Sequence, residues 1–538
     1  MRRVRGLRAA LTGLAAVGCG IAVSDLIAAL FVPGASPIRV IGALLVDNAP
    51  APAREWAINT FGVHDKTALL TGVVIGVAVV AAVTGLLYSR WPKSALLVVG
   101  AFTVVGVGAA LARPAGTAVY VVPPVCAGLV AAAVLVVVGR RAGAPAGTDE
   151  PSTDEPSADE PSTDLTADGS DEPKPDRDSG SPGWSRRRFV LAAAVAAGVI
   201  AGTEYAVRAI SSAGGALAER MKLRLPRVAD PAPPIAPGTE VTASGVTPFL
   251  TSVDDFYRID TALSVPSLTT TEWQLRIHGM VTREVTLSWD DLIAIPAMER
   301  IVTLTCVSNE VGGNLAGNGR WLGVPMRTLL DRVGVHADAD MLLSTSVDGW
   351  TSGTPLSAIT DGRDAMLAFG LNGQPLPLEH GYPVRQVIPG LYGFVSACKW
   401  VVDWEITRFD RAQSYWRKRG WGEKAPIKTA SRIDRPAPLA ILPAGPVIVA
   451  GTAWAQHRGV RKVEVRVDDG AWREATLARE YSIDTWRQWT WEWNAEPGQH
   501  TLYCRATDAT GATQPQERVE PIPDGATGWH SRVFRVDA

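Results

Sequence analysis

Apolar positions dominate the first 141 residues and are interrupted at intervals by short polar or basic stretches. Four runs carry almost no charge: residues 11–32, 67–88, 94–111 and 118–138. Each run is close to the ~20 residues that an α-helix needs to cross a bilayer. The pattern predicts an all-α region of four transmembrane helices over residues 1–141. A shorter apolar run, residues 38–46, is predicted to lie in the membrane interface.

Basic residues beside these runs predict the orientation of the helices, because cytoplasmic loops of membrane proteins are enriched in Lys and Arg. The N-terminal stretch MRRVRGLR, residues 89–93 after the second run and Arg140-Arg141 after the fourth run are all basic. Both ends of the four-helix region are therefore expected in the cytoplasm. Arg113, in an outer loop, is the exception.

A polar segment follows the helices. Residues 142–184 repeat acidic blocks such as DEPSTDEPSADEPSTD and contain few apolar side chains. Such a segment cannot bury enough apolar surface to offset the entropy of ordering it. We expect a disordered linker in the cytoplasm.

Residues 185–210 begin with Ser-Arg-Arg-Arg-Phe and continue as an apolar, Ala-rich stretch. The segment is similar to a twin-arginine export signal, and an ordinary fifth transmembrane helix with a basic flank is the alternative. Both interpretations place the following chain outside the cytoplasm. The predicted location is thus the cell (plasma) membrane, multi-pass, with residues 226–538 extracytoplasmic. Residues 226–240 are rich in Pro and Ala and are predicted to form a stiff tether.

The rest of the chain has the pattern of a globular protein in two parts. Residues 275–281 and 300–306 read as strands and residues 326–333 as a helix, which predicts a mixed α/β (α+β) core over residues 241–430. From residue 431 to 538, short alternating strands such as 463–467 and 501–506 recur between Gly and Asp turns. This spacing predicts an Ig-like β-sandwich.

Charge and cysteine content exclude several classes of protein. The net charge of −2 gives no basic excess for a nucleic-acid partner. The five cysteines, at positions 19, 126, 306, 398 and 504, show no C-x-x-C spacing, which argues against iron–sulfur clusters and attached haem. The apolar region contains one histidine, His64, so a pair of histidines for a membrane haem is not expected. The sequence does not decide whether two of the three cysteines within residues 241–538 form a disulfide.

Two stretches carry candidate chemistry. Cys306 ends an apolar strand and precedes a Gly-rich loop, where a thiolate can act as a metal ligand or a nucleophile. A small buried side chain is the ordinary alternative for a lone cysteine. In residues 371–400, His380, Arg385 and Lys399 occur among Pro and Gly turns. Cations held by such loops suit an anion site, and solvent-exposed charge is the alternative.

Together these stretches resemble the sulfite oxidase family of molybdopterin-dependent oxidoreductases, over roughly residues 245–535. The resemblance rests on T-C-V-S-N around Cys306, R-W-L-G-V-P at 320–325, S-V-D-G-W at 346–350, and the string NGQPLPLEHGYPVR with the later PG and KW. It implies a mixed α/β core and a molybdenum cofactor with one pyranopterin. It also implies an Ig-like domain that often mediates dimerisation, so a homodimer is expected.

The resemblance also implies roles for individual residues. Cys306 matches the thiolate ligand of molybdenum, which suits a soft metal ligand. His380, Arg385 and Lys399 match positions that hold the pterin and its phosphate, as cationic donors can. Less closely matched cofactor contacts are Tyr257, Asp260, Asp348, Ala397 and Cys398. Cys398 is a rival metal ligand but fits a structural role better, because it adjoins the strand that begins with Lys399-Trp400.

Two departures from the family concern the substrate pocket. The family carries Phe-Phe-x-Arg-Asn-His, whose arginine helps to hold an anionic substrate; here Ile259 takes the arginine's place and Asp260 that of the asparagine. Arg258 stands one residue early and would point the other way on an extended chain. Trp421 stands where the family has a tyrosine near the metal. Arg258 and Trp421 are candidate catalytic residues in a changed substrate pocket.

Three classes of function follow. The first is an extracytoplasmic, membrane-anchored enzyme that performs two-electron oxygen-atom transfer with a small-molecule oxygen-atom donor or acceptor and a separate electron-transfer partner. Its direction could be oxidation of sulfite-like anions or reduction of S-oxides such as methionine sulfoxide. The second is a non-catalytic binding or structural module. The third is a transporter in residues 1–140, which the scarcity of polar groups in those runs disfavours.

Overall fold

The computed structural model describes residues 2–31, 35–50, 53, 56, 60–61, 65–112, 118–142 and 212–538. The chain divides into two compact units, Met1–Ser211 and Ser212–Ala538. Three sequence predictions lie outside the described residues. They are residues 143–184 of the linker, the twin-arginine-like segment 185–210, and the loop positions His64 and Arg113.

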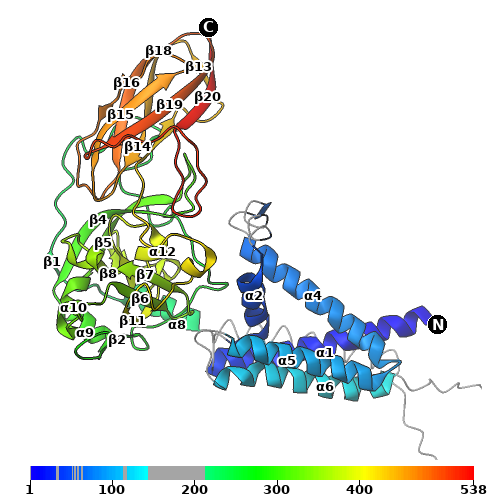
Figure 1. The fold of residues 1–538 in the computed structure, drawn as a ribbon. Helices are drawn as coiled ribbons and strands as arrows, with labels where there is room; N and C mark the ends of the chain where they lie inside the picture. Colours follow the sequence, from blue (N-terminus) through cyan, green and yellow to red (C-terminus); the bar gives the residue numbers. More distant parts are fainter. Residues whose placement is uncertain are drawn as a thin grey trace, which may run out of the picture. The chain divides into compact units, whose positions relative to one another are not determined.

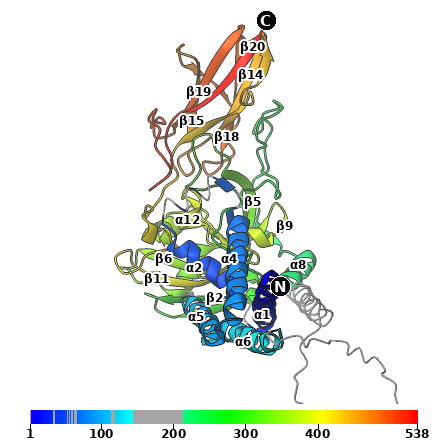
Figure 2. The same ribbon diagram turned by 90° about the vertical axis from the view of Figure 1, so that its right-hand side faces the viewer.

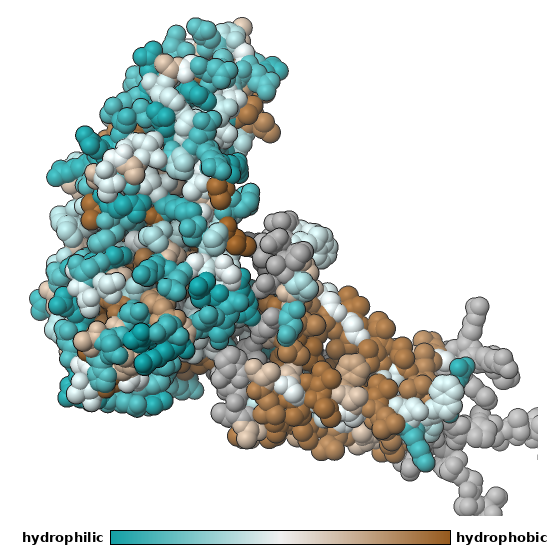
Figure 3. Space-filling view, viewed as in Figure 1, coloured by the Kyte–Doolittle hydropathy of each residue, from teal (hydrophilic) through white to brown (hydrophobic). Residues whose placement is uncertain are grey.

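The N-terminal unit is helical, as its apolar pattern predicts (Figure 1). Among the residues described, four stretches are long and apolar enough to cross a membrane: Gly6–Phe31, Ala68–Tyr88, Pro92–Leu111 and Ala118–Val138. Apolar residues cover the surface of these helices (Figure 3). The shorter predicted run forms α2. The helices are α1 (Arg2–Phe31), α2 (Pro37–Asn48), α4 (Asp65–Tyr88), α5 (Pro92–Leu111), η2 (Ala118–Val121) and α6 (Val122–Ala142).

Glycines let α1 pack closely against its neighbours. A Cβ added at Gly13 would lie 2.0 Å from the carbonyl oxygen of Ala81 on α4, and one added at Gly20 would lie 2.4 Å from that of Ala127 on α6. Apolar helices in a membrane associate by such close backbone packing, since lipid is as apolar as their side chains. The helices therefore form one bundle around α1.

The core of the second unit contains two mixed sheets (Figure 1). One has the order β1-β4-β5-β8-β10 with β9 beside β8, and the other the order β3-β2-β11-β6-β7. The first comprises β1 (Val228–Asp230), β4 (Ala297–Thr305), β5 (Ala316–Pro325), β8 (Met366–Leu371), β9 (Gln374–Pro375) and β10 (Arg385–Val387). The second comprises β2 (Gln274–Gly279), β3 (Val285–Ser288), β6 (Met341–Ser346), β7 (Thr351–Pro355) and β11 (Val401–Thr407).

Short helices complete the core. The predicted helix 326–333 is present as α10 (Met326–Val333), and it buries Met326, Leu329, Leu330 and Val333 at helical spacing. It ends at Gly334, whose φ of 69° is a left-handed conformation suited to glycine. The others are α8 (Ser212–Lys222), α9 (Trp289–Ile293), α11 (Ser357–Thr360), η3 (Leu378–His380), α12 (Gly393–Ser396) and η4 (Arg417–Arg419).

The C-terminal part is a sandwich of two sheets, with the orders β12-β14-β18-β17 and β13-β20-β19-β15-β16. Val463 and Val465 on one strand and Leu502 and Cys504 on the next are buried between the sheets, and the residues between them face outward. The predicted alternation is confirmed, and the Ig-like topology stays a prediction. The strands are β12 (Ala430–Arg435), β13 (Ile441–Pro443), β14 (Gly445–Trp454), β15 (Val460–Val467), β16 (Arg473–Glu474), β17 (Thr476–Leu477), β18 (Arg487–Ala495), β19 (Gly498–Asp508) and β20 (His530–Asp537).

The predicted tether over residues 226–240 is wrong. Val228–Asp230 forms β1 and pairs with β4, and the Arg300 guanidinium lies 2.6 Å from the Asp230 carboxylate. Further upstream, Glu219 of α8 accepts hydrogen bonds from Thr270 N and Tyr382 Oη. The core therefore begins near residue 212. Part of the Pro-rich segment that looks extended in the sequence pairs with a strand of the core sheet. All five cysteines are free thiols.

Candidate active site

A cavity of about 880 Å³, counted to its open mouth, lies in the core. Its walls come from the segment before β2, the end of β4, the turn after β6, strand β10, helix α12 and the loop around η4. Of the residues singled out in the sequence, those lining the cavity are Tyr257, Ile259, Asp260, Cys306, Asp348, Arg385, Ala397, Lys399 and Trp421.

Cys306 directly follows β4. Its backbone N–H donates to the Leu315 carbonyl at 2.9 Å, and its own carbonyl accepts from Asn309 N–H at 3.1 Å, so the strand end and the following loop are fixed together. The side chain is 8% exposed and lines the cavity. Burial raises the pKa of the thiol, against the opposing effects of a Ser308 hydrogen bond and the Lys399 charge. A thiolate at this position is therefore favoured by a bound cation.

Arg385 supplies a buried positive charge. The side chain is 4% exposed, and in the described chain its hydrogen bonds go to the carbonyl oxygens of Gln386, His380 and Ala397, at 3.3, 3.2 and 3.5 Å. Burial lowers the pKa of its guanidinium to about 10, which still leaves it charged near neutral pH. A buried guanidinium held only by carbonyls suits an anionic ligand.

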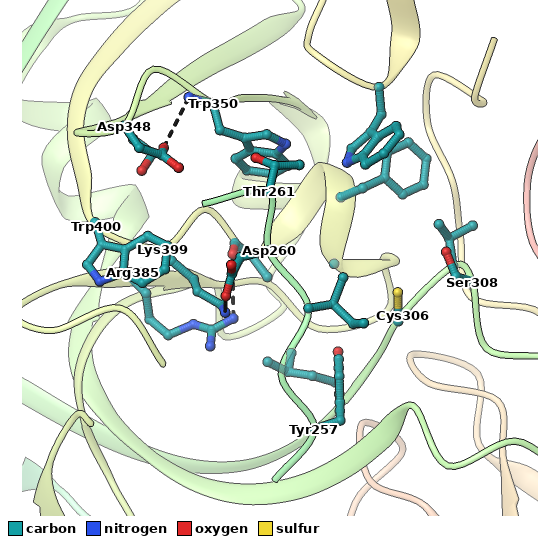
Figure 4. A pocket seen from close by; sticks show the side chains of 18 of the residues that line it. Tyr257, Asp260, Thr261, Cys306, Ser308, Asp348, Trp350, Arg385, Lys399 and Trp400 are labelled. Carbon is teal, nitrogen blue, oxygen red and sulfur yellow. Dashed lines mark hydrogen bonds and ion pairs between the residues drawn. The ribbon is translucent and has the colours of Figure 1, made fainter. Parts of the chain in front are cut away.

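Lys399 supplies a second cation. Its Nζ lies 3.0 Å from Asp260 Oδ2 and donates to the Glu379 carbonyl at 2.9 Å. Burial lowers the pKa of the Lys399 ammonium to about 8, with Asp260 opposing the shift. Cys306 and Ser308 lie on one side of the view in Figure 4, and Asp348, Arg385 and Lys399 on the other. The cavity thus offers a thiol at one end and cations toward the other.

Arg258 does not line the cavity, whereas its neighbour Ile259 does. The Arg258 guanidinium donates to Asp260 Oδ2 at 2.9 Å from a side chain that is 38% exposed. Asp260 therefore bridges Arg258 and Lys399. The structure brings Arg258 to the cavity only through this carboxylate, so a direct catalytic contact is not supported by its position.

His380 and Cys398 lie behind the cavity wall. His380 is buried against Phe256, with the ring centroids 5.7 Å apart, and its Nδ1 has no hydrogen-bond partner in the described part of the chain. Burial, reinforced by the Arg385 charge, lowers the pKa of its imidazole to about 3, so the ring is neutral. Cys398 is fully buried, and its Sγ approaches the Lys399 carbonyl at 3.7 Å. Its position suits a structural role.

Aromatic side chains form much of the remaining wall. Trp421 packs between Trp416 and Phe394, with ring-centroid distances of 5.9 and 5.8 Å, and Trp350 and Tyr257 also line the cavity. The sequence predicted Trp421 and Tyr257 as site residues. It did not lead to Trp350, Trp416, Phe394 or Ser308. Trp350 ends the S-V-D-G-W motif and Ser308 lies in T-C-V-S-N, so the two motifs could have identified these residues. No sequence motif marks Phe394.

The lowered pKa of Lys399 predicts how anion binding depends on pH. In cofactor-free protein, inorganic phosphate should bind with full affinity below about pH 8 and lose up to about tenfold above it, because a bound anion raises the lysine pKa and binding then takes up a proton. Calorimetric titration between pH 7 and 10 measures this. Lys399→Arg, whose side chain stays charged, should give a flat profile. An equal decline in that variant would contradict the assignment.

Comparisons with known proteins agree with the site. A family model described as an oxidoreductase molybdopterin-binding domain matches residues 262–416. Sulfite oxidase, mitochondrial, of Mus musculus is 31% identical over 319 residues, which is 48% of this chain and 56% of the mouse enzyme. The oxidoreductase YuiH of Bacillus subtilis (strain 168) is 32% identical over 151 residues, covering 28% of this chain and 73% of that protein.

One solved structure is also similar. The sulfane dehydrogenase SoxCD from Paracoccus pantotrophus aligns with a TM-score of 0.47 and 22% identity, over 54% of this chain and 84% of that chain. The chain spans little more than half the length of the mouse enzyme, as the 56% coverage states. On the strength of the family match and the Bacillus relative, this chain belongs to the sulfite oxidase family of molybdopterin-binding oxidoreductases.

Proposed function

We propose that the protein is a membrane-anchored, extracytoplasmic molybdenum oxidoreductase that couples two electrons to the transfer of one oxygen atom. The observation that carries the proposal is the cavity that joins the buried thiol of Cys306 to the buried cations Arg385 and Lys399. A soft thiolate suits the metal, and the cations suit the phosphate of the pterin.

The donor set fits a molybdenum cofactor in two further respects. The Arg385 guanidinium is hydrogen-bonded in the described chain to carbonyls alone, and the buried His380 Nδ1 has no partner there. Cys306 would bind the metal, Arg385 and Lys399 the phosphate, and Asp260, Asp348 and Tyr257 would line the pterin. When bound, such a cofactor supplies two-electron redox chemistry linked to the movement of an oxygen atom.

The residues of this chain then bind and orient the reactants. Arg385 and Lys399 would hold the anionic end of the cofactor, which would compensate their charge before substrate binds. Tyr257 stays protonated, because burial and the nearby Cys306 raise the pKa of its hydroxyl, and it can donate a hydrogen bond into the cavity. The aromatic side chains of Trp350, Trp416 and Trp421 limit the access of water.

We further propose that the substrate is neutral and partly apolar, such as an S-oxide, and that sulfite is handled poorly. Ile259, which is 48% exposed, lines the cavity where the family has an arginine for the anionic substrate. Indole and phenyl rings on the wall favour an apolar substrate group over a small dianion.

The test is a comparison of substrates on the purified full-length chain in detergent. We expect about one molybdenum atom and one pterin for each chain. Methionine sulfoxide should be reduced with a reduced viologen dye as donor, whereas sulfite with an artificial acceptor should react at one to two orders of magnitude below the ~10⁶ M⁻¹s⁻¹ of a well-adapted enzyme. A chain without molybdenum would refute the enzyme class, and efficient sulfite oxidation would refute the substrate class.

The location and partners are proposed on the same basis. Four apolar helices and their basic flanks support an anchor with both ends in the cytoplasm. We propose that electrons pass to or from a separate partner, without haem or iron–sulfur groups in this chain. A homodimer through the sandwich is proposed from the family resemblance.

A further inference from the structure

Strand β4 leads directly to Cys306 at the cavity. One edge of β4 is paired with a neighbouring strand along nearly its full length, whereas the other edge is paired only at its start. The strand pairs with β5 from Met298 to Thr305, whereas β1 pairs only with Ala297 and Met298. Strand β4 lies at the end of the core that faces the sandwich (Figure 1). Its neighbour β5 lies at the same end (Figures 1 and 2). The end of β4 next to Cys306 therefore needs another partner for its second edge.

The sandwich supplies that partner. Thr303 N–H donates to the Asp484 carbonyl at 3.0 Å, and Trp486 N–H donates to Thr303 Oγ1 at 2.8 Å. Thr303 Oγ1 in turn donates to Asn318 Oδ1 at 2.9 Å, within β5. Trp486 is buried in the same apolar cluster as the core sheets. The loop before β18 thus takes the place of a neighbouring strand.

Gln456 makes the contact nearest to Cys306. It lies two residues after β14, and its side-chain Nε2 donates to Thr305 Oγ1 at 2.9 Å and to the Thr303 carbonyl at 3.4 Å. Its exposed fraction is 0%. Thr305 is the residue immediately before Cys306.

The amide of Gln456 carries a cost in stability at this place. Its Oε1 is buried and has no hydrogen-bond partner in the described part of the chain, which an apolar side chain of the same shape would avoid. The same amide makes two hydrogen bonds to the end of β4. This points to a role in geometry rather than in stability.

The sandwich holds other parts of the site as well. Arg432 Nη1 donates to the Gly313 carbonyl at 2.7 Å, in the loop after Cys306, and Gly422 N–H donates to the Pro523 carbonyl at 2.7 Å, directly after Trp421. The C-terminal sandwich therefore fixes both the loop that follows Cys306 and the segment that follows Trp421.

We propose that Gln456 is a positioning residue that acts through Thr305 to orient the Cys306 thiol toward the metal, an inference that rests on the proposed role of Cys306 as metal ligand. The sandwich then belongs to the active site rather than only to an assembly surface. Loss of the Gln456 amide should free the end of β4 and change the position of the sulfur while leaving both domains folded.

The test uses Gln456→Met, which keeps the shape of the side chain, and Thr305→Val, which removes the acceptor. Gln514→Met is the matched control, since Gln514 is another buried glutamine and its side chain hydrogen-bonds to Ser431, Ala506 and Gly528, all within the sandwich. Two measurements apply: the rate of iodoacetamide alkylation of Cys306 in cofactor-free full-length chain, by mass spectrometry, and the electron paramagnetic resonance spectrum of the half-reduced, loaded protein.

Gln456→Met and Thr305→Val should each raise the alkylation rate by about threefold to tenfold, as the loss of one buried hydrogen bond predicts, and should shift the spectrum. The double variant should add little to Gln456→Met, because Thr305→Val removes one of the two hydrogen bonds that Gln456→Met already removes. Gln514→Met should leave both readouts at the wild-type value, even if it lowers the melting temperature.

Wild-type values in Gln456→Met and Thr305→Val would overturn the proposal. Absence of molybdenum from the wild type would refute the proposed function, while the alkylation series would still decide whether Gln456 positions the thiol.

Discussion

Cys306→Ser should reduce turnover by about 10³-fold or more, a loss of roughly 4 kcal/mol of transition-state stabilisation. A serine hydroxyl is a hard ligand that would have to lose its proton in a buried position, whereas the soft thiolate matches molybdenum. The variant should stay folded, because serine is close to cysteine in size and the backbone hydrogen bonds to Leu315 and Asn309 do not use the side chain. Turnover and metal content of the purified chain measure the effect.

Cys398→Ser is the matched control for that experiment. Cys398 is also buried, but its thiol does not line the cavity, and burial raises its pKa well above the ordinary value. Replacement should lower stability modestly and leave turnover within a few fold. The opposite pattern, with Cys398→Ser inactive and Cys306→Ser active, would exchange the two assignments.

Ile259→Arg should raise the catalytic efficiency for sulfite by about 10- to 100-fold. A guanidinium at this place on the cavity wall can form a charge-assisted hydrogen bond to the dianion, worth roughly 1.5–3 kcal/mol at 1.4 kcal/mol per tenfold change. Efficiency for a neutral S-oxide should stay unchanged or fall, because the arginine replaces apolar wall.

Ile259→Leu, which keeps the wall apolar, should have wild-type efficiency for both substrates. Steady-state kinetics of the three proteins with sulfite and with methionine sulfoxide give the comparison. If the arginine variant gained nothing with sulfite while retaining its molybdenum, Ile259 would not be the position that selects against anions.

The pattern of apolar positions sufficed to predict most of the fold. Four long apolar runs could only be helices of membrane length, and the alternation around Val463 and Val465 could only be strands with one buried face. The helix at residues 326–333 was also predictable, since its apolar residues recur at helical spacing and a glycine follows it. These elements are set by local sequence.

Contacts between distant segments could not be predicted. The Pro-rich segment at residues 226–240 looked like a tether, because pairing of β1 with β4 depends on a strand some 70 residues away. The His380 carbonyl accepts a hydrogen bond from Arg385, but the position of the His380 ring against Phe256 depends on packing. Phe394 and Gln456 carry no local signal, and Gln456 contacts Thr305 across 151 residues.

The support of β4 by the sandwich has a consequence for biosynthesis. A ribosome releases the chain from the N-terminus onward, so Cys306 leaves the exit tunnel long before Gln456, Asp484 and Trp486. The edge of β4 next to the thiol receives its hydrogen bonds from these residues only after synthesis has passed Trp486. The geometry around the thiol is therefore completed only after the core has been synthesised, and a cofactor that needs the thiol in its final position would be acquired late in folding.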